Sequence, residues 1–180
     1  MARTTPRRSS AVVAAALTAL MALPPRPLAA AVDHGRPACD YCRMLVEQPG
    51  FGGEVQLRSG AVRIYDAIEC MAAAVLTDSL PQRDIRAIFV IDHDTPHAKL
   101  PVGRATLVYC TSIESPMGQG FLALRDRARA GATCAPPAGT LLDWRGVLSR
   151  VNQAWFLGKL SVEAHAKAGV GPPAKPAARR

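Results

Sequence analysis

The strongest constraint on the fold of this 180-residue chain is an order of elements that occurs twice. Residues 54–57 and 62–65 are short β-rich runs on either side of a Ser-Gly turn, which is typical of a hairpin. Residues 67–76 then form an alanine-rich run that favours a helix, with Asp66 placed to cap it. Residues 85–91 are rich in β-branched side chains. The pattern predicts a strand-strand-helix-strand (ββαβ) unit.

A second unit of the same order follows. We expect strands at 98–100 and 104–110, a helix at 121–130 that ends before Gly131, and a closing strand at 140–142. The predicted fold class is therefore α+β, with two consecutive ββαβ units in one compact body. Asp143 is placed to cap a further helix, and residues 143–166 are predicted to form a C-terminal helical extension.

Both ends of the chain differ from this body in composition. Residues 1–31 combine a basic start, an apolar run too short to span a bilayer and a small-residue segment ending at Ala31, which is typical of a cleaved signal peptide. We therefore expect export, with the folded domain at 32–142. Residues 167–180 are basic and rich in Pro and Ala, and are predicted to be disordered. The apolar residue that a lipoprotein signal requires is missing before Cys39, so no lipid tether is expected.

The basic charge of the chain is confined to these ends. The formal net charge is +8, but the two ends hold eight of the 22 basic residues and none of the 14 acidic ones. The body therefore has no net charge. A nucleic-acid-binding protein carries its positive charge on the folded domain, so nucleic acid is not expected as a partner. The tail could contact an anionic membrane surface, although an inert tail is the favoured interpretation.

Sulfur-containing side chains are grouped at a few places in the chain. Cys39, Cys42 and Met44 lie within six residues, Cys70 precedes a methionine, and Met117 lies in a Pro/Gly-rich loop. Thiolates and thioethers are soft ligands that suit Cu(I). We expect the fold to bring two or more of these groups together around one Cu(I) ion. The residues are ranked Cys42 and Met117 first, then Met44, then Cys39 and Cys70.

The spacing of Cys42 and Met44 also suggests how they would face the ion. On an extended segment, residues two apart point to the same side. The fourth cysteine, Cys110, ends an apolar strand and is expected to be buried and unpaired. An odd number of cysteines in an exported chain leaves at least one without a disulfide partner.

Other interpretations of these residues remain open. Cys39 and Cys42 form a Cys-x-x-Cys, which could be a structural disulfide or a redox pair, although Asp40 is expected to raise the thiol pKa. The same sulfurs could scavenge a soft heavy metal. Residues 92–97 hold two histidines and two aspartates that could bind a harder ion, but an ordinary turn is favoured. No catalytic motif is present in the sequence, so an enzyme is not expected.

Four segments together resemble the NosL family of periplasmic copper proteins. Residues 41–44 (YCRM) resemble its Cys-Gly-Met signature, and residues 64–71 (IYDAIECM) resemble its Phe-Asp-Asp-Ile-Gly-Cys-Met segment. Residues 89–92 (FVID) resemble its Tyr-Val-aromatic-Asp strand, and residues 115–120 (SPMGQG) resemble its Pro-Met-Gly loop. The matches run in order over residues 39–130.

The resemblance implies a periplasmic accessory protein that binds one Cu(I) and is built from two ββαβ units. It also implies delivery of copper to a copper enzyme or its assembly proteins, of the nitrous oxide reductase type. Two departures loosen the link to that particular client. Arg43 replaces the glycine of the signature, and the lipoprotein cysteine is absent.

Overall fold

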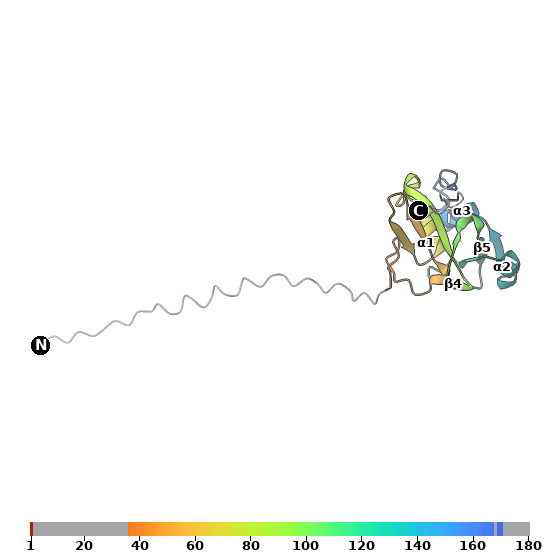
Figure 1. Ribbon diagram of the computed structural model, residues 1–180, viewed down its shortest axis with the longest axis horizontal. Coiled ribbons are helices and arrows are strands. Elements are labelled where there is room, and N and C mark those ends of the chain that lie inside the picture. Colours follow the sequence, from red (N-terminus) through yellow and green to blue (C-terminus); the bar gives the residue numbers. More distant parts are fainter. Residues whose placement is uncertain (2–35, 168, 171–180) are drawn as a thin grey trace, which may run out of the picture. The chain divides into compact units, whose positions relative to one another are not determined.

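The computed structural model describes Met1 and residues 36–167, 169 and 170. The predicted signal peptide and the part of the tail beyond Val170 lie outside these residues. Within them, the first predicted unit is confirmed. Strands β1 (Gly53–Leu57) and β2 (Val62–Tyr65) form an antiparallel hairpin, α1 (Ile68–Leu76) follows, and β3 (Ile85–Asp92) returns beside β1 (Figure 1).

The second unit repeats this topology with different elements from those predicted. It consists of β5 (Thr106–Cys110), β6 (Phe121–Leu124), α2 (Arg127–Thr133) and β7 (Gly139–Leu142). The strand order β6-β5-β7 matches the order β2-β1-β3 of the first sheet. The α+β class and the pair of ββαβ units are therefore confirmed.

Two element assignments in the second unit were wrong. The predicted strand at 98–100 is part of β4 (Thr95–Pro101), which pairs with β3 and extends the first sheet instead of starting the second unit. The predicted helix at 121–130 begins as strand β6, whose four residues are all buried. A short apolar run has no periodicity that distinguishes a buried strand from a buried helix. Residues 121–124 form a strand because they pair with β5.

The short helix α2 begins where this run ends. Asp126 caps it by accepting a hydrogen bond from the backbone N–H of Arg129 at 2.7 Å. Within the described part of the chain there are also three single-turn 3-10 helices, at Pro49–Phe51, Gln82–Asp84 and Val102–Arg104.

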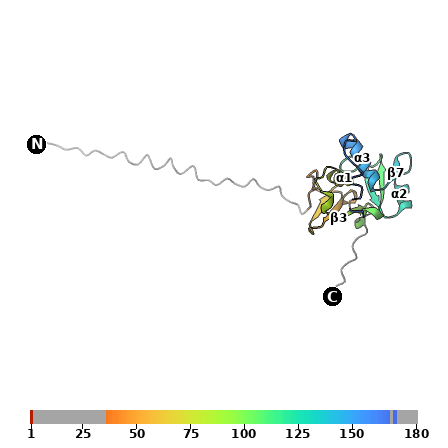
Figure 2. The same ribbon diagram turned by 90° about the horizontal axis from the view of Figure 1, so that it is seen from above.

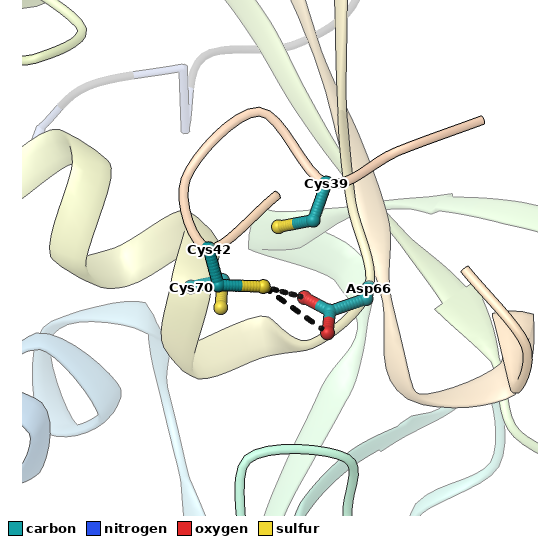
Figure 3. Close-up of side chains that lie close together, drawn as sticks. All are labelled: Cys39, Cys42, Asp66 and Cys70. Carbon is teal, nitrogen blue, oxygen red and sulfur yellow. Dashed lines mark hydrogen bonds between the residues drawn. The ribbon is translucent and has the colours of Figure 1, made fainter. Parts of the chain in front are cut away.

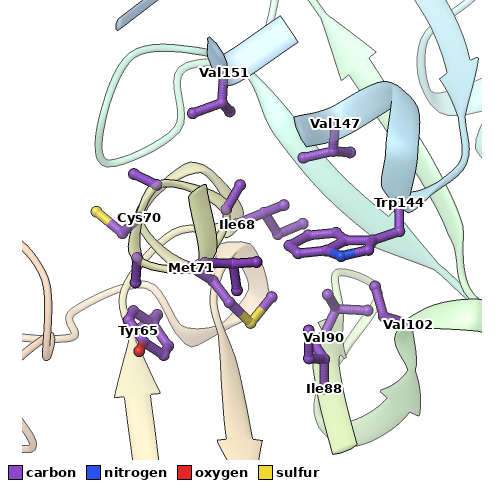
Figure 4. Packing of buried hydrophobic residues seen from close by; sticks show 14 of the residues in the cluster. Tyr65, Ile68, Cys70, Met71, Ile88, Val90, Val102, Trp144, Val147 and Val151 are labelled. Atoms are coloured by element: carbon purple, nitrogen blue, oxygen red, sulfur yellow. The ribbon is translucent and has the colours of Figure 1, made fainter. Parts of the chain in front are cut away.

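Helix α1 forms the centre of the main hydrophobic core. All nine of its residues are buried, and eight of them are apolar, as expected for a helix that lies inside the core. It packs against the sheet and against α3 (Trp144–Phe156), which lies beside it in both ribbon views (Figures 1 and 2). Figure 4 shows Trp144, Val147 and Val151 of α3 directed toward α1. Helix α1 therefore offers a rigid base for any side chain that it directs out of the core.

Helix α3 begins at its predicted cap. Asp143 accepts a hydrogen bond from the backbone N–H of Gly146 at 2.8 Å. Its buried apolar face belongs to the same core as the first unit. None of the described helices is long and apolar enough to cross a bilayer.

A second, smaller core is formed by the second unit together with Phe51, and it contains a disulfide. Cys110, at the end of β5, is bonded to Cys134, which caps the end of α2, and their Cα atoms are 5.9 Å apart. The prediction that Cys110 is unpaired was therefore wrong, although it is fully buried. Residues between them form β6 and α2, and this return brings the two cysteines together. Three cysteines remain free: Cys39, Cys42 and Cys70.

Candidate metal centre

The segment around Cys39 forms a tight turn that is pinned to the edge of the first sheet. The backbone N–H of Cys39 donates to the carbonyl of Met44 at 2.8 Å, and the N–H of Arg43 donates to the carbonyl of Cys39 at 3.0 Å. Asp40 fixes the turn to β2, because its carboxylate accepts a hydrogen bond from the backbone N–H of Ile64 at 2.9 Å. The two thiols of this turn are thereby held beside the start of α1.

The turn separates Cys42 from Met44. Arg43 has φ +68°, a left-handed conformation that glycine adopts most easily. The chain therefore reverses between the two residues, and Met44 is 45% exposed. The expectation that an extended segment directs both sulfurs to one side was wrong. Arg43 is the residue that stands where the signature resembled by residues 41–44 has glycine.

The turn also packs against α3. The ring of Tyr41 stacks on that of Trp155, with centroids 6.3 Å apart and an angle of 19° between the planes. The C-terminal helix therefore also supports the segment that carries Cys39 and Cys42.

Cys70 reaches the same place from α1. Figure 3 shows Cys39 and Cys42 on the turn, Cys70 on the helix, and Asp66 just before the helix. Their sulfur and carboxylate oxygen atoms all lie within 4.8 Å of one another. Cys39, Cys70 and Asp66 are buried, whereas Cys42 is partly exposed. Among the described residues, this is the one group of three or more Cys, His, Asp and Glu side chains close enough to hold a metal ion.

Asp66 is a member of this group that the sequence did not identify. Helix α1 begins one residue later than predicted, with Ala67 at its cap and no side-chain capping bond. The carboxylate of Asp66 accepts hydrogen bonds from the thiol of Cys42 instead, at 3.5 Å to each oxygen. The prediction that Asp66 caps the helix was therefore wrong. The available signal was its spacing, four residues before Cys70.

The thiols of Cys39 and Cys70 form a coupled pair. A hydrogen bond with Cys70 lowers the pKa of Cys39 to about 6, despite its burial. The same hydrogen bond, together with burial, raises the pKa of Cys70. One thiolate is therefore held in the cluster at neutral pH. The carboxylate of Asp40, the other charged group of the turn, is engaged by the backbone of Ile64 and by Arg63, whose Nη1 is 3.3 Å away.

The pKa of the Cys42 thiol is shifted in the opposite direction from that of Cys39. Burial is the largest of the effects that raise the pKa of its thiol to about 11. The sulfur that solvent can reach is therefore protonated at neutral pH. A soft cation that entered the cluster would displace protons from Cys42 and Cys70 and meet a thiolate already present at Cys39.

The two candidate methionines are less buried than Cys39 and Cys70. Met117 is partly buried against the main core, in the loop between β5 and β6. Its neighbour Pro116 lines a groove of about 470 Å³ together with Met44 and Leu45, which directly follow the turn that carries Cys39 and Cys42. The loop that carries Met117 therefore lies beside the segment that carries Cys42 and Met44.

The histidine-containing segment is part of a hairpin. Residues 92–97 include the turn between β3 and β4, where Asp94 accepts a hydrogen bond from Nε of Arg129 at 2.7 Å. This arrangement agrees with the favoured interpretation of an ordinary turn.

Comparisons with known proteins agree with the resemblance of the four segments. The sequence model of the NosL family matches residues 31–151, about two thirds of the chain. The fold is similar to the crystal structure of the copper chaperone NosL from Shewanella denitrificans, with a TM-score of 0.55 and 18% identity over 64% of this chain and 92% of that chain. No curated protein sequence matches the chain.

Proposed function

The chain belongs to the NosL family, and from this premise we propose that it is a copper-binding chaperone that carries one Cu(I) ion in its sulfur cluster. The observation that carries the proposal is the meeting of Cys39 and Cys42 with Cys70 across the fold. These thiols come from two segments that the fold has to bring together. Soft sulfur donors at this density suit Cu(I) better than oxygen-preferring cations.

The arrangement supports binding that can be reversed. Cys39 and Cys70 are fully buried, and Cys42 lies at the partly exposed side of the cluster. An acceptor thiolate could approach the ion from this side and displace one ligand at a time. Met117 and Met44 are neutral thioethers that need no deprotonation, and we propose them as weaker ligands near this opening. The ligand set thus consists of Cys39, Cys42 and Cys70 with Met117 or Met44.

The alternative of a thiol-redox enzyme is less well supported. A catalytic thiol must be both ionised and accessible. In this cluster, burial raises the pKa of the accessible Cys42, while the ionised Cys39 has no exposed surface. Ionisation and accessibility are therefore found on different thiols. This separation does not suit a catalytic thiol but is compatible with metal binding.

The cellular setting of this activity is also a proposal. We expect export to the periplasm with cleavage near Ala31, and a copper-enzyme assembly system as the acceptor. The client of nitrous oxide reductase type follows only from the family resemblance. A chaperone must release its metal ion to an acceptor, whereas a heavy-metal scavenger retains it, so release of the ion distinguishes the two functions.

Competition titration tests the proposal. The reduced, metal-free protein is titrated with Cu(I) against a chromophoric Cu(I) chelator under anaerobic conditions. We expect one Cu(I) per chain, and an affinity at least about 10-fold lower in Cys42→Ser, which corresponds to about 1.4 kcal/mol. The serine variant keeps the shape of the side chain but removes the soft donor, and thermal unfolding of the metal-free form serves as its control.

Three outcomes would contradict the proposal. The first is wild-type protein that retains no Cu(I). The second is equal affinity in wild type and Cys42→Ser. The third is reductase activity toward a protein disulfide by metal-free protein, which would support the redox alternative. Failure of the loaded protein to yield its copper to a competing thiol would favour a scavenger.

A further inference from the structure

Glu69 is a buried carboxylate in the first turn of α1, the most apolar helix among the described residues. It is 0% exposed and lies between Ile68 and Cys70 on α1, whose other residues are apolar. Within the described part of the chain, no Lys, Arg or His forms an ion pair with it. Burial of a carboxylate is costly unless hydrogen bonds compensate for the lost water. An apolar side chain would suit this position better if packing were its only role.

The hydrogen bonds of Glu69 all lead to one loop. Its Oε1 accepts from the hydroxyl of Ser115 at 2.7 Å and from the backbone N–H of Gln119 at 3.3 Å. The hydroxyl of Ser115 in turn accepts from the backbone N–H of Gly120 at 2.9 Å. The other carboxylate oxygen, Oε2, is buried and has no partner. One oxygen of Glu69 thus holds both ends of the loop 115–120, which belongs to the second ββαβ unit.

This loop carries Met117 between its two tethered ends. The loop is a compact turn, in which Gly118 donates from its N–H to the carbonyl of Ser115 at 2.9 Å. Gly118 and Gly120 both have positive φ, so the loop has a backbone that few other residues could adopt. Pro116 borders the same groove as Met44. The tether therefore connects the helix that bears Cys70 to the loop that bears a candidate thioether ligand.

We propose that Glu69 is a positioning residue for the metal centre, which holds the Met117 loop on α1 beside the cysteine cluster. The inference rests on the copper-binding function proposed above. It assigns Cys70 and the tether to the first ββαβ unit, and the thioether that the tether places to the second unit. Met117 would then be available to the ion without ordering a free loop at each binding event.

A double-mutant cycle in Cu(I) affinity tests this role. The four proteins are wild type, Glu69→Ala, Met117→Ala and the double variant, each titrated against the chromophoric Cu(I) chelator. We expect Glu69→Ala to weaken binding by about 10-fold, a typical effect of removing a residue that orients a ligand. Because Glu69 acts through Met117, the double variant should bind within about twofold of Met117→Ala alone.

Matched variants distinguish positioning from general stability. Glu69→Gln keeps the size of the side chain and an oxygen that can accept both hydrogen bonds, so its affinity should remain close to that of wild type. Ser115→Ala removes the tether from the loop side and should reproduce the effect of Glu69→Ala even if the latter folds poorly. In the metal-free protein, amide hydrogen exchange of Gln119 and Gly120 should be faster in both alanine variants.

The results also separate this proposal from the one on which it rests. Wild-type protein without Cu(I) binding would overturn the copper function itself. Wild-type binding with Glu69→Ala and Met117→Ala effects that multiply in the double variant would overturn the positioning role alone. Unchanged exchange at Gln119 and Gly120 in the metal-free variants would likewise show that Glu69 does not hold the loop.

Discussion

At the scale of single residues, the thiols of Cys39 and Cys42 ionise in opposite directions although they share one turn. Cys39 shares a hydrogen bond with Cys70, whereas Cys42 is surrounded by groups that disfavour its thiolate, with burial the largest effect. The cluster therefore holds one negative charge on sulfur before any metal arrives. Further thiolates form only when a cation replaces their protons.

Spectroscopic titration of the reduced, metal-free protein tests this account. The ultraviolet absorbance of thiolate should rise in a step near the pKa of about 6 of Cys39, and Cys39→Ser should lack that step. Cys42 should remain protonated until its pKa of about 11 is approached. Absence of any thiolate signal below pH 8 in wild type would contradict the predicted pairing of Cys39 with Cys70.

The same shift predicts a pH dependence of stability. A pKa lowered from 9.0 to about 6 in the folded protein means that the ionised Cys39 stabilises the fold fully above pH 9, and that this contribution is lost as the pH falls toward 6. The loss of unfolding free energy in Cys39→Ser should therefore be larger at pH 8 than at pH 5. Equal losses at both values would be inconsistent with a native-state thiolate.

The candidate site could be predicted in part from the chain because its chemistry is unusual. Cysteines and methionines that are grouped in a sequence already restrict the metals that could bind. Of the five residues predicted as ligands, Cys39, Cys42 and Cys70 lie together in the structure. Asp66 was missed because an aspartate before an alanine-rich run also fits a helix cap, and only the position of Cys42 separates the two roles. The outward direction of Met44 follows from the left-handed backbone of Arg43, which side-chain patterns do not reveal.

At the scale of elements, the first ββαβ unit was predictable and the second was not. The hairpin of β1 and β2 has a Ser-Gly turn that the sequence shows directly. The alanine-rich run of α1 is long enough for its composition to favour a helix over a strand. In β6, four apolar residues were merged with the residues of α2 into one helix. The pairing of β6 with β5 is a tertiary contact, and the local sequence does not contain it. The same reason explains why β4 was assigned to the wrong unit.

The disulfide of the second unit gives a prediction at this scale. Cys110 and Cys134 close a loop with a sequence separation of 24. Chain-entropy arguments give a stabilisation of about 3 kcal/mol for a loop of this order. The double variant Cys110→Ala/Cys134→Ala should therefore lose about 3 kcal/mol in chemical unfolding monitored by circular dichroism.

Copper binding provides the control for this variant. The disulfide belongs to the smaller core, whereas Cys39 and Cys70 belong to the main core. We therefore expect the folded double variant to keep the Cu(I) affinity of wild type within about twofold. A stability equal to that of wild type would contradict the cross-link, and a large loss of affinity would place these cysteines in the metal centre.

At the scale of the whole molecule, the repeated topology accounts for the location of the candidate centre. The first unit supplies α1 with Cys70, and the preceding turn supplies Cys39 and Cys42. In our proposal, the second unit adds the loop with Met117. Helix α3 supports the turn through the stacking of Trp155 on Tyr41. The segments that carry the candidate ligands are short, and the two ββαβ units hold them in place.

The claim on which this account depends is that sulfurs from the turn and from α1 bind the same copper ion. X-ray absorption at the copper edge, on protein loaded with one equivalent of Cu(I), measures the ligands directly. We predict a first shell made of sulfur in wild type, with one sulfur fewer in Cys42→Ser and also in Cys70→Ser. A shell of nitrogen or oxygen, or a sulfur shell that neither substitution changes, would contradict the account.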